Sequence, residues 1–260
     1  MIAAFGRAIW SEWLKRRRSL TTWLVAGSAA FVPAIVFAAR FRRIAALPAV
    51  YRDPAFWPAL WVQMWESMAL LMLPLSVMLL VSLITQIEDR SHGWKQLHAA
   101  PLPLPAIFLA KLTVVLFLIA QLIAAFVFGI YVAGIGPALV LASVDRPLIA
   151  FPLLRFAGRA AAFYVDVSPI VALQYLLALR FRTFLTPLGV GLALWILSIG
   201  AIRWPYSFLI PYTYASLDYL IVEYHRPLAV PANPTVIAAG VFFVLTLVAY
   251  AVYALRRDKG

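Results

Sequence analysis

Long, almost uncharged apolar stretches recur along the chain, separated by shorter polar segments. Six are long enough to cross a bilayer as helices, which takes about 20 apolar residues each. Their apolar residues run on continuously instead of alternating, which favours helices over barrel strands. The stretches lie at residues 19–39, 60–87, 105–135, 160–179, 183–202 and 235–255. The sequence therefore predicts an all-α, polytopic membrane protein with a single transmembrane domain over residues 1–260.

The composition supports this interpretation. Apolar residues make up 65% of the chain, charged residues 12%, and the mean hydropathy is +0.93. A soluble domain is about 45–50% apolar and about 25% charged, so both a soluble globule and a disordered chain are excluded. The chain has no cysteine, which excludes a disulfide framework and thiolate chemistry.

The net charge of +12 indicates an orientation in the membrane. In a soluble protein this charge would suggest nucleic acid as a partner, but basic residues of membrane proteins gather in cytoplasmic loops beside anionic lipid. Six spans place both termini on one side, and with the termini inside 13 of the 22 Lys and Arg residues lie inside. We therefore expect both termini in the cytoplasm.

Aromatic residues gather in the segments expected on the outer side. Such rings are typical of the lipid headgroup layer, and we expect them there. They are Trp57, Trp61, Trp65, Trp204, Tyr206, Tyr212, Tyr214, Tyr219 and Tyr224.

Residues 1–18 precede the first span and have the pattern of an amphipathic helix. Ile2, Phe5, Ile9 and Trp13 share one face, and Arg7, Ser11, Lys15 and Arg18 lie opposite. One interpretation is a helix lying in the membrane plane. The other is a basic flank that only sets the topology.

The connection between the second and third spans, residues 88–104, is the most polar cytoplasmic connection. Pro101 predicts the end of a short helix over about residues 91–100. Trp94 and Leu97 are three residues apart and give this helix an apolar side. It is either a surface that docks another protein or an ordinary polar loop.

This region resembles the membrane subunit of type-2 ABC exporters, in particular the branch that includes the lantibiotic-immunity permeases. The family pattern has an acidic residue at the end of the second span, then Trp-Lys-x-Leu, a proline, and Ala-Lys-Leu in the third span. Here these are Glu88, residues 94–97, Pro101 and residues 110–112. Trp61, Trp65, Pro74 and the N-terminal residues Glu12, Lys15 and Arg16 also match. Residues 102–104 and the long aromatic segment 204–231 depart from the pattern.

The resemblance implies a bacterial inner-membrane permease that pairs with a second copy or a paralogue. Two separate ATPase chains would bind ATP and Mg²⁺, so no cofactor is expected in this chain. The residues implied to couple to the ATPase are Glu88, Asp89, Gly93, Trp94, Lys95, Leu97 and Pro101. The N-terminal in-plane helix, with Glu12, Lys15 and Arg16, would also contact it.

Motifs for other chemistry are absent from the sequence. There is no P-loop, no His-Glu-x-x-His and no Gly-x-Ser-x-Gly. His92 and His98 are six residues apart on a polar segment, and no metal site is expected. We therefore expect a transport subunit and no enzyme.

A few polar residues lie inside the predicted spans. One interpretation of Glu66, with Gln63 on the same side of its helix, and Asp166 is that they line the dimer interface or an outer vestibule and meet a cationic substrate. The other is a structural pair with Arg159, Arg155 or a backbone group, or exposure at a thinned interface. Gln121 and Gln174 either bond across helices or contact substrate.

Lys111 should extend to the cytoplasmic surface. Gly189 and Gly191 should allow close helix packing.

The sequence thus predicts the permease of an ATP-driven exporter for a peptide, an antibiotic or a lipid-like compound. A secondary transporter is the first alternative, although no internal repeat is evident. A membrane-embedded enzyme and a membrane scaffold are the others.

Overall fold

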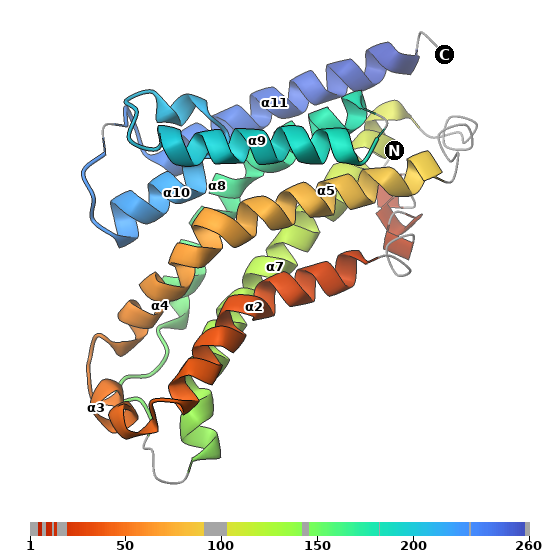
Figure 1. Ribbon diagram of the computed structural model, residues 1–260. Coiled ribbons are helices and arrows are strands. Elements are labelled where there is room, and N and C mark those ends of the chain that lie inside the picture. The colour runs from red at the N-terminus through yellow and green to blue at the C-terminus, as the bar shows by residue number, and fades with distance from the viewer. Residues whose placement is uncertain are drawn as a thin grey trace.

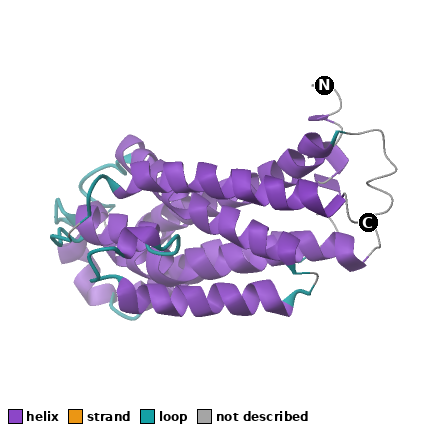
Figure 2. Cartoon of the chain, turned by 90° about the horizontal axis from the view of Figure 1, so that it is seen from above, coloured by secondary structure: helices purple, strands orange, loops and turns teal. Residues whose placement is uncertain are grey.

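The computed structural model describes residues 5, 6, 9–11, 13, 14, 20–90, 103–141, 146–181, 183–228 and 230–257. Over these residues the chain consists of helices and loops, and no strand occurs (Figure 2). The predicted all-α class is therefore confirmed.

Six apolar helices, one for each predicted stretch, make up most of the bundle. In chain order the elements are α2 (Thr21–Phe41), η1 (Ile44–Ala46), α3 (Leu47–Tyr51), α4 (Phe56–Ser67), η2 (Met68–Met72), α5 (Leu73–Arg90), α7 (Leu104–Val140), α8 (Leu153–Arg180), α9 (Leu185–Ala201), η3 (Ser207–Leu209), α10 (Tyr214–Asp218), η4 (Tyr219–Glu223) and α11 (Pro234–Arg257). We call one end of the bundle the terminal end (Figure 1). Three helices end there, α5, α8 and α11, and three begin there, α2, α7 and α9. The opposite end is called the distal end.

Five of the helical segments are long and apolar enough to cross a membrane. These are α2, the continuous segment α4–η2–α5, α7, α8 and α11. Helix α9 is apolar but has only 17 residues, about 25 Å at 1.5 Å per residue. A bilayer core is about 30 Å thick, so α9 lies at the lower limit for a span.

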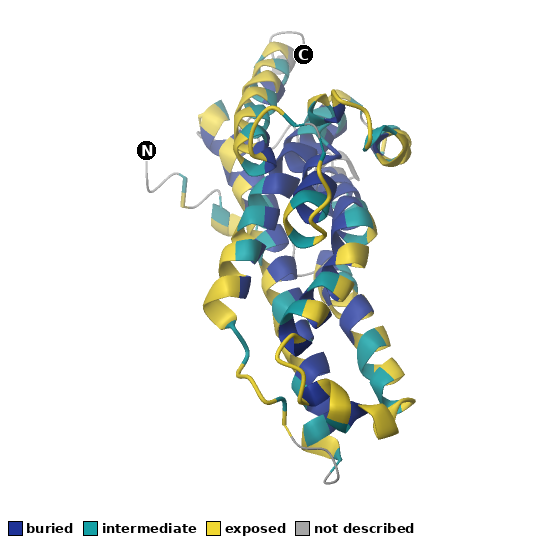
Figure 3. Cartoon of the chain, turned by 90° about the vertical axis from the view of Figure 1, so that its left-hand side faces the viewer, coloured by how far each residue is buried: buried dark blue, intermediate teal, exposed yellow. Residues whose placement is uncertain are grey.

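Helix α8 lies at the centre of the bundle. It packs against α5, α7, α9, α10 and α11, while α2 packs along α7. Buried residues concentrate on these facing surfaces, and the outward faces are exposed and largely apolar (Figure 3). This pattern is expected for a bundle surrounded by lipid, since exposed apolar side chains need no cover there.

The second apolar segment bends where α4 passes through the π-helical turn η2 into α5 (Figure 1). Pro74 has no N–H to donate to the carbonyl of Leu70, four residues earlier. The indole Nε1 of Trp195 on α9 donates to that carbonyl over 3.0 Å. A side chain from another helix thus replaces the bond that the proline cannot make.

Aromatic rings from α4, α7 and α8 pack in a column through the distal half of the core. Trp61 stacks on Phe156 with 4.2 Å between ring centroids, and Trp65 stacks on Phe163 with 3.9 Å. Trp57, Trp61 and Trp65 are 2%, 1% and 0% exposed. The prediction that these tryptophans lie in the headgroup layer is therefore wrong, because their rings fill the space between helices.

Part of the N-terminal segment is described, and its described residues are helical. Phe5, Ile9 and Trp13 from the predicted apolar face are half-buried, and the ring of Trp13 meets Phe117 of α7 at 5.3 Å. Trp10 and Leu14 are exposed. The predicted contact residues Glu12, Lys15 and Arg16 lie outside the described residues.

Candidate functional site

A cluster of charged side chains joins α8 to the segment between α9 and α11. Arg159 of α8 donates from Nη2 to Oδ2 of Asp218 over 2.5 Å and from Nε to Oε1 of Glu223 over 2.6 Å. Asp218 ends α10 and Glu223 ends η4. A π-helical turn bonds residue i to residue i+5, so it brings these two carboxylates to the same side of their helix. One guanidinium thereby holds both.

The surroundings of this cluster are mostly apolar. The side chain of Asp218 is 2% exposed and that of Glu223 10%. Arg159 also lies over the ring of Phe163, 5.3 Å from its centroid. Burial raises the pKa of Asp218 above its ordinary value, and the adjacent Arg159 acts in the opposite direction.

Asp166 lies about two turns further along α8, towards the terminal end. It is 0% exposed, and neither carboxyl oxygen has a hydrogen-bond partner of normal geometry. The carboxyl of Asp218 and the hydroxyl of Thr235 at the start of α11 are its polar neighbours. The structural alternative for Asp166, a pair with Arg159 or Arg155, is not formed, because Arg159 is bonded to Asp218 and Glu223.

A proline three residues after Asp166 leaves α8 continuous. Pro169 cannot donate to the carbonyl of Val165, and the hydroxyl of Ser168 donates to it over 2.7 Å.

Gln174 forms a second polar node, closer to the terminal end. Its Nε2 donates to the carbonyl of Pro187 on α9 over 2.8 Å and lies 3.4 Å from Oγ of Ser82 on α5. Its Oε1 accepts from the hydroxyl of Tyr212 over 3.0 Å. Gln174 therefore joins α5, α8, α9 and the segment 202–213, which agrees with its predicted role of bonding across helices.

The contacts of Tyr212, Asp218 and Glu223 give the course of the segment between α9 and α11. Tyr212 meets α8 at Gln174, and Glu223 meets α8 at Arg159, 15 residues nearer the distal end. The chain thus leaves α9 at the distal end, folds back into the bundle as far as Tyr212, and returns as α10 and η4 (Figure 1). We call residues 202–224 the re-entrant segment.

This course corrects the prediction for the aromatic rings of the re-entrant segment. Tyr212, Tyr214 and Tyr219 are 1%, 0% and 1% exposed and pack inside the bundle, whereas Trp204, Tyr206 and Tyr224 are exposed at its edge. The hydroxyl of Tyr219 donates to the carbonyl of Val62 on α4 over 3.2 Å. The segment therefore belongs to the core and bridges α4 and α8.

Gly191 allows the close packing around Gln174. A Cβ atom at this position would lie 2.6 Å from Oε1 of Gln174, 2.8 Å from Sδ of Met78 and 2.9 Å from the hydroxyl of Tyr212. Gly189, in contrast, has nothing within 4 Å of such an atom. Of the two glycines predicted to allow close packing, only Gly191 has that role within this chain.

Gly191→Ala should lower the stability of the protein by about 1–3 kcal/mol, because the methyl group displaces Gln174 or Tyr212 from their hydrogen bonds. The measurement is the apparent melting temperature in detergent. Gly189→Ala is the matched control and should be neutral or slightly stabilising, since alanine favours a helix over glycine. Equal melting temperatures for the two variants would contradict this account of the packing.

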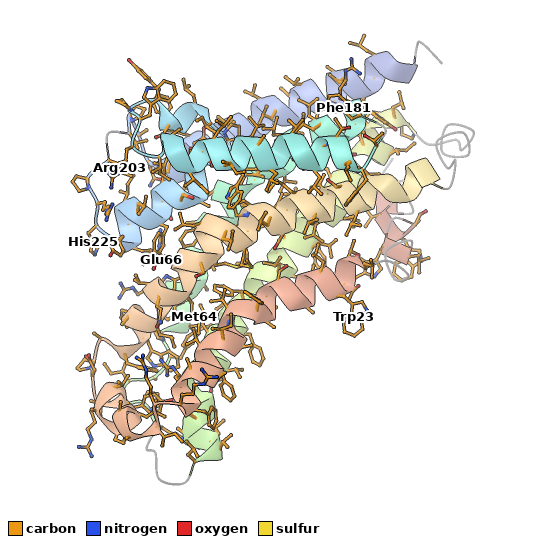
Figure 4. The ribbon with its side chains drawn as sticks, viewed as in Figure 1. Trp23, Met64, Glu66, Phe181, Arg203 and His225 are labelled. Atoms are coloured by element: carbon orange, nitrogen blue, oxygen red, sulfur yellow. The ribbon has the colours of Figure 1, made fainter. Side chains whose placement is uncertain are left out.

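A small cavity of about 160 Å³ opens beside the charged cluster. Arg155, Arg159, Glu223 and His225 line it, with Trp61 and Phe156 among its apolar residues. His225 follows η4 with a φ of 53°, and it lies on the distal side of the bundle together with Glu66 (Figure 4). The cavity connects the cluster to the distal surface.

The other predicted path residues face outward. Gln63 and Glu66 are exposed on α4, and Gln121 is exposed on α7. The structure therefore does not bring Glu66 into the buried cluster around Asp166. Lys111 was expected to reach the surface, but it is 2% exposed within the bundle.

The predicted coupling residues fall at the end of α5 and beyond it. Glu88 and Asp89 belong to the last turn of α5, at the terminal end. The structure describes the backbone of these two residues but not their side chains. The other predicted coupling residues lie wholly outside the described residues: Gly93, Trp94, Lys95, Leu97 and Pro101.

Sequence reasoning missed Asp218, Glu223 and the pairing of both with Arg159. The partners are 59 and 64 residues apart in sequence, and no short motif connects them. The available signal was the scarcity of acidic residues, of which the chain has 10. Because acidic residues are so few, Asp218 and Glu223 in one aromatic segment could have been predicted to pair with Arg159 in an apolar span.

Among the known families, the model described as ABC-2 family transporter protein matches residues 8–198. No curated protein and no solved structure matches the chain. The family match ends near the end of α9, before the re-entrant segment and α11.

Proposed function

The chain belongs to the ABC-2 family of transporter proteins, and from this premise we propose that it exports its substrate across the bacterial inner membrane. Membership makes it a multi-pass membrane protein and the permease subunit of an ABC transporter, with an ABC ATPase as its partner. The observation that carries the proposal is the family match over residues 8–198, on a bundle of long apolar helices. The proposed substrates are peptides, antibiotics or lipid-like compounds, as for the lantibiotic-immunity permeases.

We place six spans in the membrane, with α9 as the shortest, and both termini in the cytoplasm. Seventeen residues are within the range of about 17–25 that a spanning helix uses. With six spans, the C-terminal ends of α5, α8 and α11 lie on the same side of the membrane, and most of the basic residues lie on that side. The terminal end is then cytoplasmic and the distal end faces outward.

ATP would drive the transport movement of the permease through the connection that follows α5. Glu88 and Asp89 end a helix that runs without interruption from Leu73, so a push on this end is transmitted along α5 into the core. Trp94, Lys95 and Leu97 would rest on the ATPase, and the N-terminal helix would add a second contact. The partner ATPase would bind ATP and Mg²⁺, and closure of two ATPase chains would rock two permease copies.

Trp94→Ala, alone and together with Glu88→Gln, should remove the ATPase from the permease. The measurement is co-purification after co-expression with a candidate ABC ATPase, followed by ATP-driven uptake of labelled candidate substrates into inside-out vesicles. Trp204→Ala is the matched control, because Trp204 is 51% exposed at the distal end. We expect the control to keep the complex and the uptake.

Two results would count against the proposal. An intact complex with full ATPase activity in the Trp94 variants would remove the docking role of this segment. Uptake that depends on an ion gradient and not on ATP would favour a secondary transporter instead.

The proposed substrate path combines outward-facing and enclosed polar groups. Gln63, Glu66 and Gln121 lie on exposed faces, which in a dimer would face the second permease copy or lipid. Asp166 and Gln174 are enclosed in the single chain, so a substrate would reach them only after α8 and the re-entrant segment separate. Carboxylates in such a path favour a substrate that carries a cationic group.

A further inference from the structure

The buried charges beside α8 do not balance. Three carboxylates, those of Asp166, Asp218 and Glu223, gather near one guanidinium, that of Arg159. Arg159 bonds to Asp218 and Glu223, and neither oxygen of Asp166 has a partner of normal geometry. With every carboxyl ionised, the enclosed group would carry two excess negative charges.

The elements packed around Asp166 offer no further cation among the described residues. From its own helix the charged neighbour is Arg159, and from α10 it is Asp218. Helix α11 contributes the hydroxyl of Thr235, which carries no charge. Helix α9 has no titratable residue, and the ionisable residues of α5 and Lys111 of α7 lie towards the terminal end.

An isolated carboxylate in an apolar interior costs several kcal/mol, and such a group takes up a proton instead. A bound metal ion would balance this charge less well than a proton, since hard cations take six or more oxygen ligands. Asp166, Asp218 and Thr235 offer three oxygen-bearing groups. No cluster of three His, Cys, Asp or Glu residues suited to a metal occurs in the described part of the chain.

We infer that Asp166 and Asp218 form a proton-binding site, a pair of carboxyl groups that holds one proton between them. The proton removes the repulsion between two neighbouring carboxylates, as two acids that share a site cannot both ionise readily. It thereby fastens α10, and with it the re-entrant segment, to α8.

Loss of this proton would place two negative charges against each other and favour separation of α10 from α8. The cavity lined by Arg155, Glu223 and His225 reaches Arg159, which bonds to Asp218, but neither Asp166 nor Asp218 lines it. Proton binding would therefore favour the closed arrangement of the distal end, through the different proton affinity of the two arrangements. This site does not depend on the ABC assignment or on any ATPase.

Infrared spectroscopy of the full chain in detergent tests the proposal directly. At pH 7 exposed carboxyls are ionised, so the wild type should show the C=O band of one protonated, enclosed carboxyl. Carbon-13 labelling of aspartate should shift the band, which assigns it to aspartate and does not require a variant to fold. Asp166→Asn should abolish it, whereas Glu66→Gln, which changes an exposed carboxyl of α4, should leave it intact.

Thermal stability gives a second, independent measurement. Above about pH 4 the unfolded chain releases this proton while the folded pair keeps it, so the stability of the wild type should fall as pH rises. We expect a drop in melting temperature on the order of 10 °C between about pH 5 and pH 8, relative to Asp166→Asn.

Three results would overturn the inference. The first is the absence of a protonated aspartate band at pH 7. The second is the same pH profile of melting for the wild type and Asp166→Asn. The third is a melting temperature that rises with sodium but not with choline chloride, which would show that a metal ion and not a proton balances the charge.

Discussion

Arg159→Ala should destabilise the folded protein by about 3–5 kcal/mol, because it leaves two enclosed carboxylates without their cation. Asp218 and Glu223 lie 2.5 Å and 2.6 Å from the guanidinium and are 2% and 10% exposed. Asp218 does not line the cavity beside the cluster, so it has no water-filled space to turn into. The expected measurement is a fall in apparent melting temperature on the order of 10 °C in detergent.

Arg155→Ala is the matched control for this prediction. Arg155 is on the same helix, one turn nearer the distal end, and is exposed, so its loss should change stability by less than about 0.5 kcal/mol. A triple variant, Arg159→Met with Asp218→Asn and Glu223→Gln, removes all the charges together. It should recover most of the loss, because the penalty comes from the uncompensated carboxylates and not from the absence of the ion pairs. A triple variant as unstable as Arg159→Ala would refute this explanation.

The single helices were predictable because each long apolar stretch is continuous. Helices α2 and α11 occupy the stretches between Ser19 and Ala39 and between Thr235 and Leu255, and even Pro33 is accommodated inside α2. The start of α8 was less predictable. Its stretch was expected at residues 160–179, and the helix covers Leu153–Arg180, because Arg155 and Arg159 interrupt the apolar run without ending the helix.

The aromatic residues were misplaced for a physical reason. A ring with a polar tip suits the headgroup layer, but it equally suits a crowded core in which the tip finds a backbone carbonyl. Tyr214 donates to the carbonyl of Phe208, and Tyr219 to that of Val62. Sequence gives the ring but not the partner, and the partner of Tyr219 lies 157 residues away.

Close packing shows the same limit. Gly189 and Gly191 are two residues apart in one apolar helix and look equivalent in sequence. Helical residues two apart face different directions, so only one of them can meet Gln174 and Tyr212. Which one does so depends on the rotation of α9 about its axis, and only tertiary packing sets this rotation.

Trp65→Ala should cost about 3 kcal/mol, near the lower end for the loss of a large buried ring. Trp65 is 0% exposed, stacks on Phe163 of α8 at 3.9 Å and meets Phe126 of α7 edge-on at 5.1 Å. In a membrane the ring gains little by leaving lipid, so the loss is one of packing contacts and of the cavity left behind. The measurement is the apparent melting temperature in detergent.

Trp23→Ala is the control, because it makes the same chemical change on α2, where the ring is 78% exposed and points away from the bundle (Figure 4). It should change the melting temperature little. Equal losses for the two variants would mean that the ring column does not hold α4 to α8. If the column does hold them, Trp65→Ala should also weaken the contact of Tyr219 with Val62, since the same face of α4 supports both. Proteolysis within the re-entrant segment should then be faster in Trp65→Ala than in Trp23→Ala.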